Sequence, residues 1–212
     1  MKAAILVSGS GTNLQSFIDQ VADKRLDLEI VLVFSSRKDA YGLTRASSAG
    51  IQTACIEHGD YEDRELFDRA VAAKLDESEP ELIILAGFMR ILSPWFVRRY
   101  AGRILNIHPA LLPRYPGLNT HVRVLEAGDE QHGSTVHFVT EELDGGPGIL
   151  AGRIAVKPGE TADELQARVL AVEHQIYPQA AQLFADGRVS LKDGKAYMDG
   201  ELLGDPIVSD FS

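Results

Sequence analysis

The chain has 212 residues, 45% of them hydrophobic and 25% charged, which is typical of a globular protein that forms one large α/β domain or at most two small ones. Its net charge of −10 argues against general nucleic-acid binding, so any anionic ligand needs local arginines or backbone N–H groups. The single cysteine, Cys55, excludes an internal disulfide and fits a reducing compartment, and because it lies in an apolar run we expect it to be buried.

The sequence contains no recognisable membrane or export signal. No apolar segment approaches the roughly 18 residues that a membrane-spanning helix needs. The N-terminus runs directly into an apolar strand pattern, without a charged leader and a cleavage site. We therefore expect a cytoplasmic protein that binds neither membranes nor nucleic acid.

The first predicted elements are a strand, a glycine-rich turn and a helix. Residues 3–7 are apolar throughout, as in a strand that is buried on both faces of a parallel sheet. Residues 8–13 (Ser-Gly-Ser-Gly-Thr-Asn) break this run, and apolar residues at helical spacing follow. Such a turn can hold a phosphate, because N–H groups at the helix start converge on an anion.

The details of the turn favour a monophosphate over a dinucleotide. Leu14 occupies the position where a dinucleotide fingerprint has a third small residue. The second predicted strand, residues 28–34, ends in Ser35-Ser36-Arg37 rather than in the acidic residue that binds the ribose of NAD. The alternative to a phosphate site is that residues 8–13 form a tight turn that binds no ligand, and these residues alone do not exclude it.

Strand and helix patterns then alternate as far as His108. The further strands are expected at residues 53–56, 82–86 and 103–108, and the helices at 41–49, 61–77 and from Ser93-Pro94 onward. This alternation predicts a Rossmann-like α/β fold with a mostly parallel sheet and helices on both faces. In such sheets ligands bind beyond the carboxyl ends of the strands.

The second half of the chain has a different pattern. Residues 109–120 are expected to form a long irregular loop, and strands at 133–140 and 149–156 are expected to pair antiparallel, which makes the sheet mixed. A capping box at Thr161–Glu164 opens a long helix, and a hairpin turn follows at 192–195. We expect one domain over 1–212, with halves at 1–108 and 109–200 and a frayed tail at 204–212.

Asn106 and His108 are the strongest candidates for chemistry. They are two apart at the end of a predicted strand that Pro109 terminates, so their side chains point the same way. An amide beside an imidazole can stabilise an oxyanion and handle a proton. The alternative is that Asn106 starts a turn and His108 is a core histidine. Asp144 precedes a glycine, as is common in turns, and Glu173 is explained as part of a solvated helix face.

Five motifs occur together in a recognisable order. They are residues 8–14 (SGSGTNL), 86–92 (AGFMRIL), 106–113 (NIHPALLP), His121 and 143–147 (LDGGP). The ordered set closely resembles the phosphoribosylglycinamide formyltransferase family, the folate-dependent enzymes of purine biosynthesis. The resemblance extends from Met1 to about Leu191.

The resemblance implies transfer of a formyl group from 10-formyltetrahydrofolate to the amine of glycinamide ribonucleotide, without a metal, by a monomer or a homodimer. It implies that Asn106, His108 and Asp144 are catalytic. It assigns the ribonucleotide to Gly11, Thr12, Asn13 and Glu173, so that residues 1–108 form a nucleotide-binding-like half and 109–200 a folate and catalytic half. The implied folate contacts are Arg64, Met89, Arg90, Ile91, Leu92, Asn106, Thr140, Glu141, Glu142, Leu143 and Asp144.

The expected mechanism needs no protein nucleophile, because the substrate amine attacks the formyl carbon. Asn106 and a protonated His108 would stabilise the oxyanion. Histidine is mostly uncharged at neutral pH, so a nearby Asp144 carboxylate would favour its charged form. Asp144 could also orient a water that carries a proton from the amine to the departing folate nitrogen.

Three positions depart from the family pattern. Ala110 replaces a common serine, Asn119 a common histidine and Gly148 a larger apolar residue. Asn119 puts any auxiliary role for a histidine there in doubt, and Gly148 is expected to loosen the folate loop.

Four other functions remain to be distinguished. A formyltetrahydrofolate hydrolase uses the same residues with water as acceptor, and a tRNA formyltransferase uses a larger acceptor; relatives of both kinds carry an added domain. A nucleotide-dependent dehydrogenase conflicts with Leu14 and with Ser35-Ser36-Arg37. A non-catalytic phosphate-binding module leaves Asn106, His108 and Asp144 unexplained.

Overall fold

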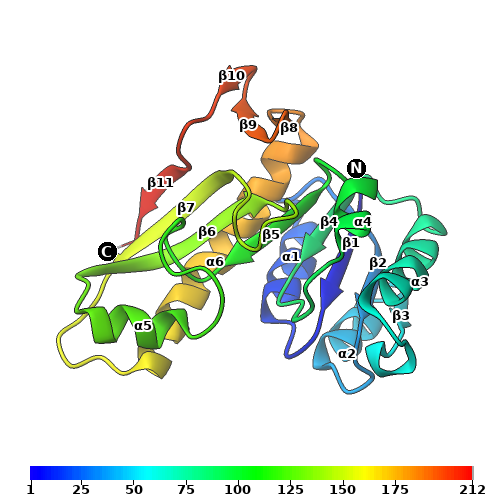
Figure 1. Cartoon of the computed structure of the whole chain (residues 1–212), viewed down its shortest axis with the longest axis horizontal. Coiled ribbons are helices and arrows are strands. Elements are labelled where there is room, and N and C mark those ends of the chain that lie inside the picture. The colour runs from blue at the N-terminus through cyan, green and yellow to red at the C-terminus, as the bar shows by residue number, and fades with distance from the viewer. Residues whose placement is uncertain (212) are drawn as a thin grey trace. The chain divides into compact units, whose positions relative to one another are not determined.

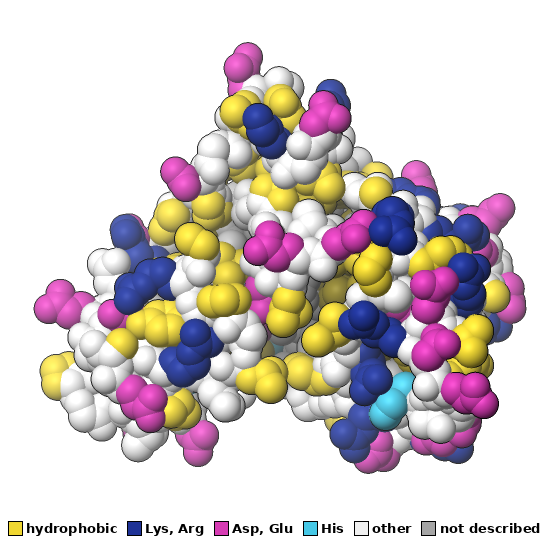
Figure 2. All heavy atoms as spheres, viewed as in Figure 1, with side chains coloured by type: hydrophobic (Ala, Val, Ile, Leu, Met, Phe, Trp, Pro, Cys, Tyr) yellow, Lys and Arg dark blue, Asp and Glu magenta, His cyan; other side chains and the backbone are white. Residues whose placement is uncertain are grey.

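The structure is a computed structural model that describes residues 1–211, so Ser212, the last residue of the predicted tail, lies outside the described residues. The chain divides into two compact units, Met1–Leu105 and Asn106–Ser212. Within residues 1–211 no helix is both long and apolar enough to cross a membrane. Acidic and basic side chains are interspersed on the face drawn in Figure 2.

The first unit contains the predicted parallel sheet. Its strands lie in the order β3-β2-β1-β4, and all neighbours pair parallel (Figure 1). The strands are β1 (Lys2–Val7), β2 (Glu29–Ser35), β3 (Thr53–Cys55) and β4 (Leu82–Leu85). The apolar run at 3–7 is fully buried, which confirms the reading of β1 as a strand covered on both faces.

Four α-helices connect and cover these strands. They are α1 (Thr12–Ala22), α2 (Tyr41–Ser48), α3 (Arg64–Asp76) and α4 (Pro94–Arg99), and a short 3₁₀ helix lies at His58–Asp60. Because right-handed crossovers run from β1 to β2 to β3 and then back to β4, α1 and α2 share one face and α3 and α4 the other. The carboxyl ends of β1 and β4 are therefore neighbours.

The helix starts follow their capping residues. Ser93 caps α4 by accepting a hydrogen bond from the Phe96 N–H at 3.3 Å, and Pro94 occupies the first turn, as predicted. Asp63 accepts from the Leu66 N–H at 2.8 Å, so α3 begins at Arg64 and not at Tyr61. The capping residue thus sets a boundary that hydrophobic spacing alone does not.

The expectation that Cys55 is buried is wrong. Cys55 ends β3, a strand of three residues at the end of the sheet order, and its side chain is exposed. Partial burial, with the nearby Glu57 carboxylate, still raises the pKa of its thiol. An apolar run on an edge strand has one open side, which the sequence does not reveal.

Strand β5 (Ile104–His108) leads into the second unit, where the antiparallel pair was correctly predicted. Strands β6 (Gln131–Phe138) and β7 (Gly148–Ala155) pair antiparallel, and β11 (Ile207–Asp210) pairs parallel to β7. The fold is thus α/β with a mixed, mostly parallel sheet. A separate antiparallel sheet contains β8 (Val189–Lys192), β9 (Lys195–Met198) and β10 (Glu201–Leu202).

Two further helices belong to this unit. The long α6 (Ala162–Ala185) starts at the predicted capping box and packs on β6 and β7. The contact is close at Gly152, where a Cβ would lie only 2.1 Å from Val172 Cγ1. The short α5 (Thr120–Ala127), which was not predicted, follows the loop and packs on α6.

The tail that was expected to fray is instead ordered. Residues Ile207–Asp210 form β11 on the edge of β7, and Arg153 holds Asp210 with two hydrogen bonds of 2.6 and 3.0 Å. Upstream, a Cβ on Gly148 would lie 3.0 Å from Pro206 Cβ, so the missing side chain leaves room for the tail. The free edge of β7 supplies the pairing partner that a short apolar tail cannot show in sequence.

Candidate active site

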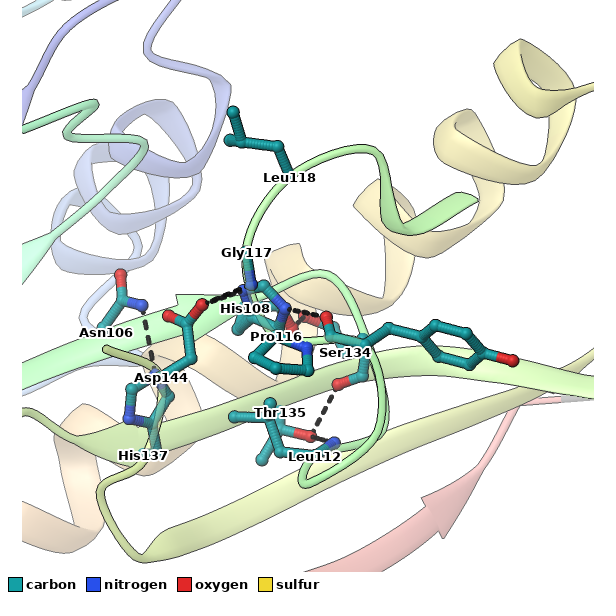
Figure 3. A network of polar contacts seen from close by, with 12 residues as sticks. Asn106, His108, Leu112, Pro116, Gly117, Leu118, Ser134, Thr135, His137 and Asp144 are labelled. Carbon is teal, nitrogen blue, oxygen red and sulfur yellow. Dashed lines mark hydrogen bonds and ion pairs between the residues drawn. The ribbon is translucent and has the colours of Figure 1, made fainter. Parts of the chain in front are cut away.

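Asn106 and His108 lie at the carboxyl end of β5, as predicted. Isoleucine and leucine at positions 104, 105 and 107 anchor the strand in the core, while His108 is 5% exposed and Asn106 is half-buried. Figure 3 shows both side chains beside Asp144. The three residues that the family resemblance singled out therefore lie together within the second unit.

The imidazole of His108 lies between two acceptors. Its Nε2 is 2.8 Å from the Tyr115 carbonyl oxygen and its Nδ1 is 3.4 Å from Asp144 Oδ2. A carbonyl oxygen only accepts, so Nε2 carries the hydrogen in this contact. Nδ1 faces Asp144, so a ring with a hydrogen on both nitrogens satisfies both contacts.

Asp144 is held by the backbone of its own loop and of the loop after β5. It has a φ of 51°, a left-handed conformation that aspartate tolerates better than most residues. Its Oδ2 accepts from the Gly117 N–H at 2.8 Å (Figure 3). Gly146 behind it has no room for a side chain, because a Cβ there would lie 1.8 Å from the Phe138 carbonyl oxygen. The path of the loop thus requires a glycine at position 146.

Hydroxyl groups of β6 hold the chain after β5. The Ser134 hydroxyl donates to the His108 carbonyl at 2.7 Å, and the Thr135 hydroxyl donates to the Ala110 carbonyl at 2.7 Å. Thr135 Oγ1 also accepts from the Leu112 N–H at 3.1 Å. Both side chains are fully buried. The sequence placed these residues on a strand and gave them no role, because their burial is visible only in the structure.

Glu173 lies on α6 and is buried, with 7% exposure, so the solvated-face interpretation of this residue is wrong. Its Oε1 lies 3.1 Å from the Ser134 hydroxyl, which in turn contacts the His108 backbone. The resemblance to the formyltransferases had already marked this position. Burial beside Ser134 connects α6 to the segment that carries His108.

The remaining predicted residues of this unit, 140–143, form the exposed start of the Asp144 loop. The Thr140 hydroxyl donates to the Glu142 carbonyl at 3.4 Å, and Leu143 is 56% exposed. Glu141 and Glu142 are also exposed. These side chains are accessible to a ligand.

The glycine-rich turn of the first unit has the predicted geometry. Gly11 is the N-cap residue of α1, with a φ of 69°, and no side chain caps the helix there. A Cβ on Gly11 would lie 2.7 Å from the Gly42 Cα of α2. Arg45 of α2 donates through Nε to the Ser10 carbonyl at 2.8 Å and fixes the turn from outside. Thr12 and Asn13 follow in the first turn of α1, where backbone N–H groups can face an anion.

The segment after β4 lies against this turn. The Ser8 N–H donates to the Gly87 carbonyl at 3.1 Å, and Ser8 Oγ accepts from the Met89 N–H at 2.9 Å. Met89 and Ile91 are 72% and 56% exposed, while Arg90 and Leu92 are half-buried. Two of the predicted binding segments, separated by over 70 residues, therefore meet at one edge of the sheet.

Arg64 and Arg90 line a common pocket of about 260 Å³. Glu62 and Asp63 also contribute to its lining, so the pocket carries both signs of charge. Behind it, Asp68 is 1% exposed and accepts from the Ser93 N–H at 2.5 Å. Burial raises the pKa of the Asp68 carboxyl, while the contacts with Ser93 and the charges of the two arginines lower it. Asp68 thus fixes the end of the segment that carries Arg90.

Within residues 1–211 no group of three or more histidine, cysteine, aspartate or glutamate side chains is placed to hold a metal ion.

Comparison with known proteins identifies the family. The formyl transferase family matches residues 1–181. The chain is 49% identical to phosphoribosylglycinamide formyltransferase of Escherichia coli, over 96% of each chain, and 46% identical to that of Haemophilus influenzae, over 95% of each. It superposes on phosphoribosylglycinamide formyltransferase of Coxiella burnetii with a TM-score of 0.92 at 45% identity, covering 98% of this chain and 99% of that one. From these matches the chain belongs to the formyl transferase family and, within it, to the phosphoribosylglycinamide formyltransferase enzymes.

Proposed function

We propose that this protein transfers the formyl group of 10-formyltetrahydrofolate to the amine of glycinamide ribonucleotide, giving N-formylglycinamide ribonucleotide and tetrahydrofolate in de novo purine biosynthesis. The observation that carries the proposal is the position of His108, with Nε2 on the Tyr115 carbonyl and Nδ1 facing Asp144. The relatives named above bear this activity in their names.

The reaction begins with attack of the substrate amine on the formyl carbon, which turns the formyl oxygen into an oxyanion. The Asn106 amide and the Nδ1–H of a protonated His108 donate to this oxygen. Nδ1 takes this role because Nε2 is engaged with the Tyr115 carbonyl at 2.8 Å, whereas the contact between Nδ1 and Asp144 is longer, at 3.4 Å, so that the Nδ1–H can be shared with the oxyanion. Losing one such donor typically costs about 10²–10³ in rate.

The tetrahedral intermediate must then lose the folate nitrogen. The bond from the formyl carbon to that nitrogen breaks, the new bond to the glycyl nitrogen remains, and one proton moves from the amine to the folate nitrogen. Asp144 assists this transfer through a water. Its carboxylate also faces His108 Nδ1 at a separation of 3.4 Å and so helps to hold the ring in place.

Backbone and charge support the assignment of the two substrates. We assign the phosphate of the ribonucleotide to Gly11, Thr12 and Asn13 at the start of α1. We assign Glu173, from the family resemblance, to the same substrate. Arg64 and Arg90 bind the acidic tail of the folate, while Met89, Ile91, Leu92 and residues 140–143 contact its ring system. Folate is a co-substrate here, and the proposal requires no metal.

The decisive experiment measures release of tetrahydrofolate from 10-formyltetrahydrofolate with and without glycinamide ribonucleotide. We expect release to depend on the ribonucleotide and to match the formylated product in amount. Equal release without the ribonucleotide would identify a hydrolase. A formylated methionyl-tRNA product would identify a tRNA formyltransferase. No turnover with any acceptor would favour a non-catalytic phosphate-binding module.

A further inference from the structure

His137 is buried directly beside Asn106. It lies on β6 with 2% exposure, and its Nε2 is 3.1 Å from Asn106 Nδ2 (Figure 3). The other ring nitrogen, Nδ1, is 2.9 Å from the Phe138 carbonyl oxygen. Neither the sequence motifs nor the proposed mechanism gives this histidine a function.

The Phe138 carbonyl decides which nitrogen of His137 carries the hydrogen. A carbonyl oxygen only accepts, so Nδ1 must donate. Burial lowers the pKa of His137, and the nearby His108 lowers it further, against the opposing effects of the Phe138 carbonyl and the Asp144 charge. The neutral ring therefore has its hydrogen on Nδ1 and a lone pair on Nε2.

That lone pair in turn decides the orientation of the Asn106 amide. An amide presents an acceptor oxygen on one side and a donor NH₂ group on the other, and the two have nearly the same shape. Opposite a lone pair, only the NH₂ group makes a hydrogen bond. One of its hydrogens goes to His137, and the second remains for a developing oxyanion. With the hydrogen on Nε2 instead, the amide would turn its oxygen to the ring and lose this arrangement.

We propose that His137 is a positioning residue, which holds the Asn106 amide in its donor orientation through a fixed Nδ1–H tautomer. The role of the amide as an oxyanion donor rests on the proposed function, whereas the tautomer and the hydrogen bond do not. His137 touches no reacting atom and acts only through Asn106.

The first test observes the ring directly. Two-bond ¹H–¹⁵N correlation spectra of the whole protein, with His137 assigned from the His137→Gln variant, distinguish the Nδ1–H, Nε2–H and doubly protonated forms. We expect the Nδ1–H pattern at neutral pH. Either of the other two patterns overturns the proposal, and this result is independent of whether the protein transfers formyl groups.

The second test compares two amide replacements of similar polarity. In His137→Gln the side-chain oxygen reaches the place of Nε2 and can accept from Asn106. In His137→Asn the shorter amide reaches only the place of Nδ1, so it can contact the Phe138 carbonyl and not Asn106. We expect His137→Gln to keep kcat within about tenfold of the parent, and His137→Asn to approach the loss of about 10²–10³ for a missing oxyanion donor. KM for both substrates should change little, and equal kcat in the two variants contradicts the proposal.

A double-mutant cycle separates positioning from a structural role. Because His137 acts through Asn106, His137→Asn should reduce kcat much less in the Asn106→Ala background than in the parent. Circular dichroism and thermal unfolding establish that each variant is folded. The same fold-loss in both backgrounds would assign His137 a role that does not pass through Asn106, and would overturn the inference.

Discussion

The two ring nitrogens of His108 have different hydrogen-bonding roles because they contact different groups. The backbone carbonyl of Tyr115 contacts Nε2 at 2.8 Å. Asp144 stands opposite Nδ1, and its own position depends on the Gly117 N–H. The Tyr115 carbonyl and the Gly117 N–H, which contact His108 and Asp144, are therefore both backbone groups of the loop after β5.

Replacing Asp144 by asparagine tests its charge while keeping its shape. The neutral amide removes the negative charge that faces His108 Nδ1, and it cannot assist proton transfer as a base. We expect kcat to fall by at least about 10²-fold, within the range typical of general acid–base groups. The measurement is steady-state turnover across pH, and a kcat within a few-fold of the parent with an unchanged pH profile contradicts the role.

Arg64 offers a test of folate-tail binding with a matched control on the same helix. It is exposed at the mouth of the pocket that it shares with Arg90, so Arg64→Ala should raise the folate KM by up to about fivefold, the size of an exposed ion pair. Arg69 is engaged elsewhere, with Glu65 at 2.8 Å and with the ring of Trp95. Arg69→Ala removes the same charge and should leave the folate KM unchanged; equal effects would argue against a specific contact.

At the scale of elements, the turn between β1 and α1 is shaped by contacts from α2 and from the end of β4. Gly11 approaches Gly42, Arg45 binds the Ser10 carbonyl, and Ser8 contacts residues 87 and 89. The proposed phosphate contacts are backbone N–H groups, whose direction is set by the path of the turn, so these contacts from α2 and β4 would keep the N–H groups in place.

Gly11→Ala should disturb this turn more than Gly9→Ala. The first variant combines a positive φ with a Cβ 2.7 Å from the Gly42 Cα, whereas a Cβ on Gly9 meets nothing within 4 Å. We expect Gly11→Ala to cost about 1–3 kcal/mol of unfolding free energy and to raise the KM for the ribonucleotide. Urea unfolding of both variants, together with ribonucleotide titration of the first, checks this. Equal stability of the two would show that the turn relaxes freely.

The contact between α5 and β6 makes stability depend on pH. His121 Nδ1 and His132 Nε2 are 2.9 Å apart, and burial, aided by the neighbouring His121, lowers the pKa of His132 to about 4. Burial likewise lowers the pKa of His121. As pH falls below about 6.5, His132 becomes protonated in the unfolded chain but stays neutral in the folded protein. The free energy of unfolding therefore decreases from about pH 6.5 down to about pH 4.

This linkage predicts a slope of about 1.4 kcal/mol of unfolding free energy per pH unit for each such proton in that window. Urea unfolding between pH 7 and 5 measures it. The His132→Gln variant removes the titrating group and should flatten the dependence. An identical slope in the variant would assign the acid sensitivity to other residues.

Across the whole molecule, the success of sequence prediction depended on how local each signal is. Buried runs, glycine breaks and capping residues are local, so β1 to β7 and the start of α6 were found. The shared direction of Asn106 and His108 follows from strand periodicity alone. Asp144 joined them only through the family resemblance, because nothing local connects position 144 with position 108.

Features that depend on distant or backbone partners were missed. The Tyr115 carbonyl and the Gly117 N–H carry no side-chain signature. Exposure of Cys55 depends on the edge position of β3, and the order of the tail depends on the open edge of β7. The side-chain direction of His137 could have been predicted from the sequence, since His137 shares a face of a predicted strand with Thr135.

Removing β11 tests how much the tail stabilises the second unit. A chain that ends at Asp205 loses the pairing with β7 and leaves that edge exposed. We expect Tm to fall by more than about 5 °C, since about 1 kcal/mol corresponds to roughly 2–4 °C in a chain of this size. Asp210→Ala in the full chain removes only an exposed ion pair and should cost about 1 kcal/mol or less. An unchanged Tm after truncation would mean that the strand adds no net stability.

Gly148 couples two sites that are distant in sequence. A Cβ there would lie 3.0 and 3.2 Å from two atoms of Pro206 and 3.3 Å from Thr135 Cγ2, so a valine at 148 should destabilise the 212-residue chain more than one that ends at Asp205. The effect of the substitution thus depends on the genetic background in which it occurs. Loss of the glycine and loss of the tail are therefore expected to accompany each other in evolution, as an epistatic pair.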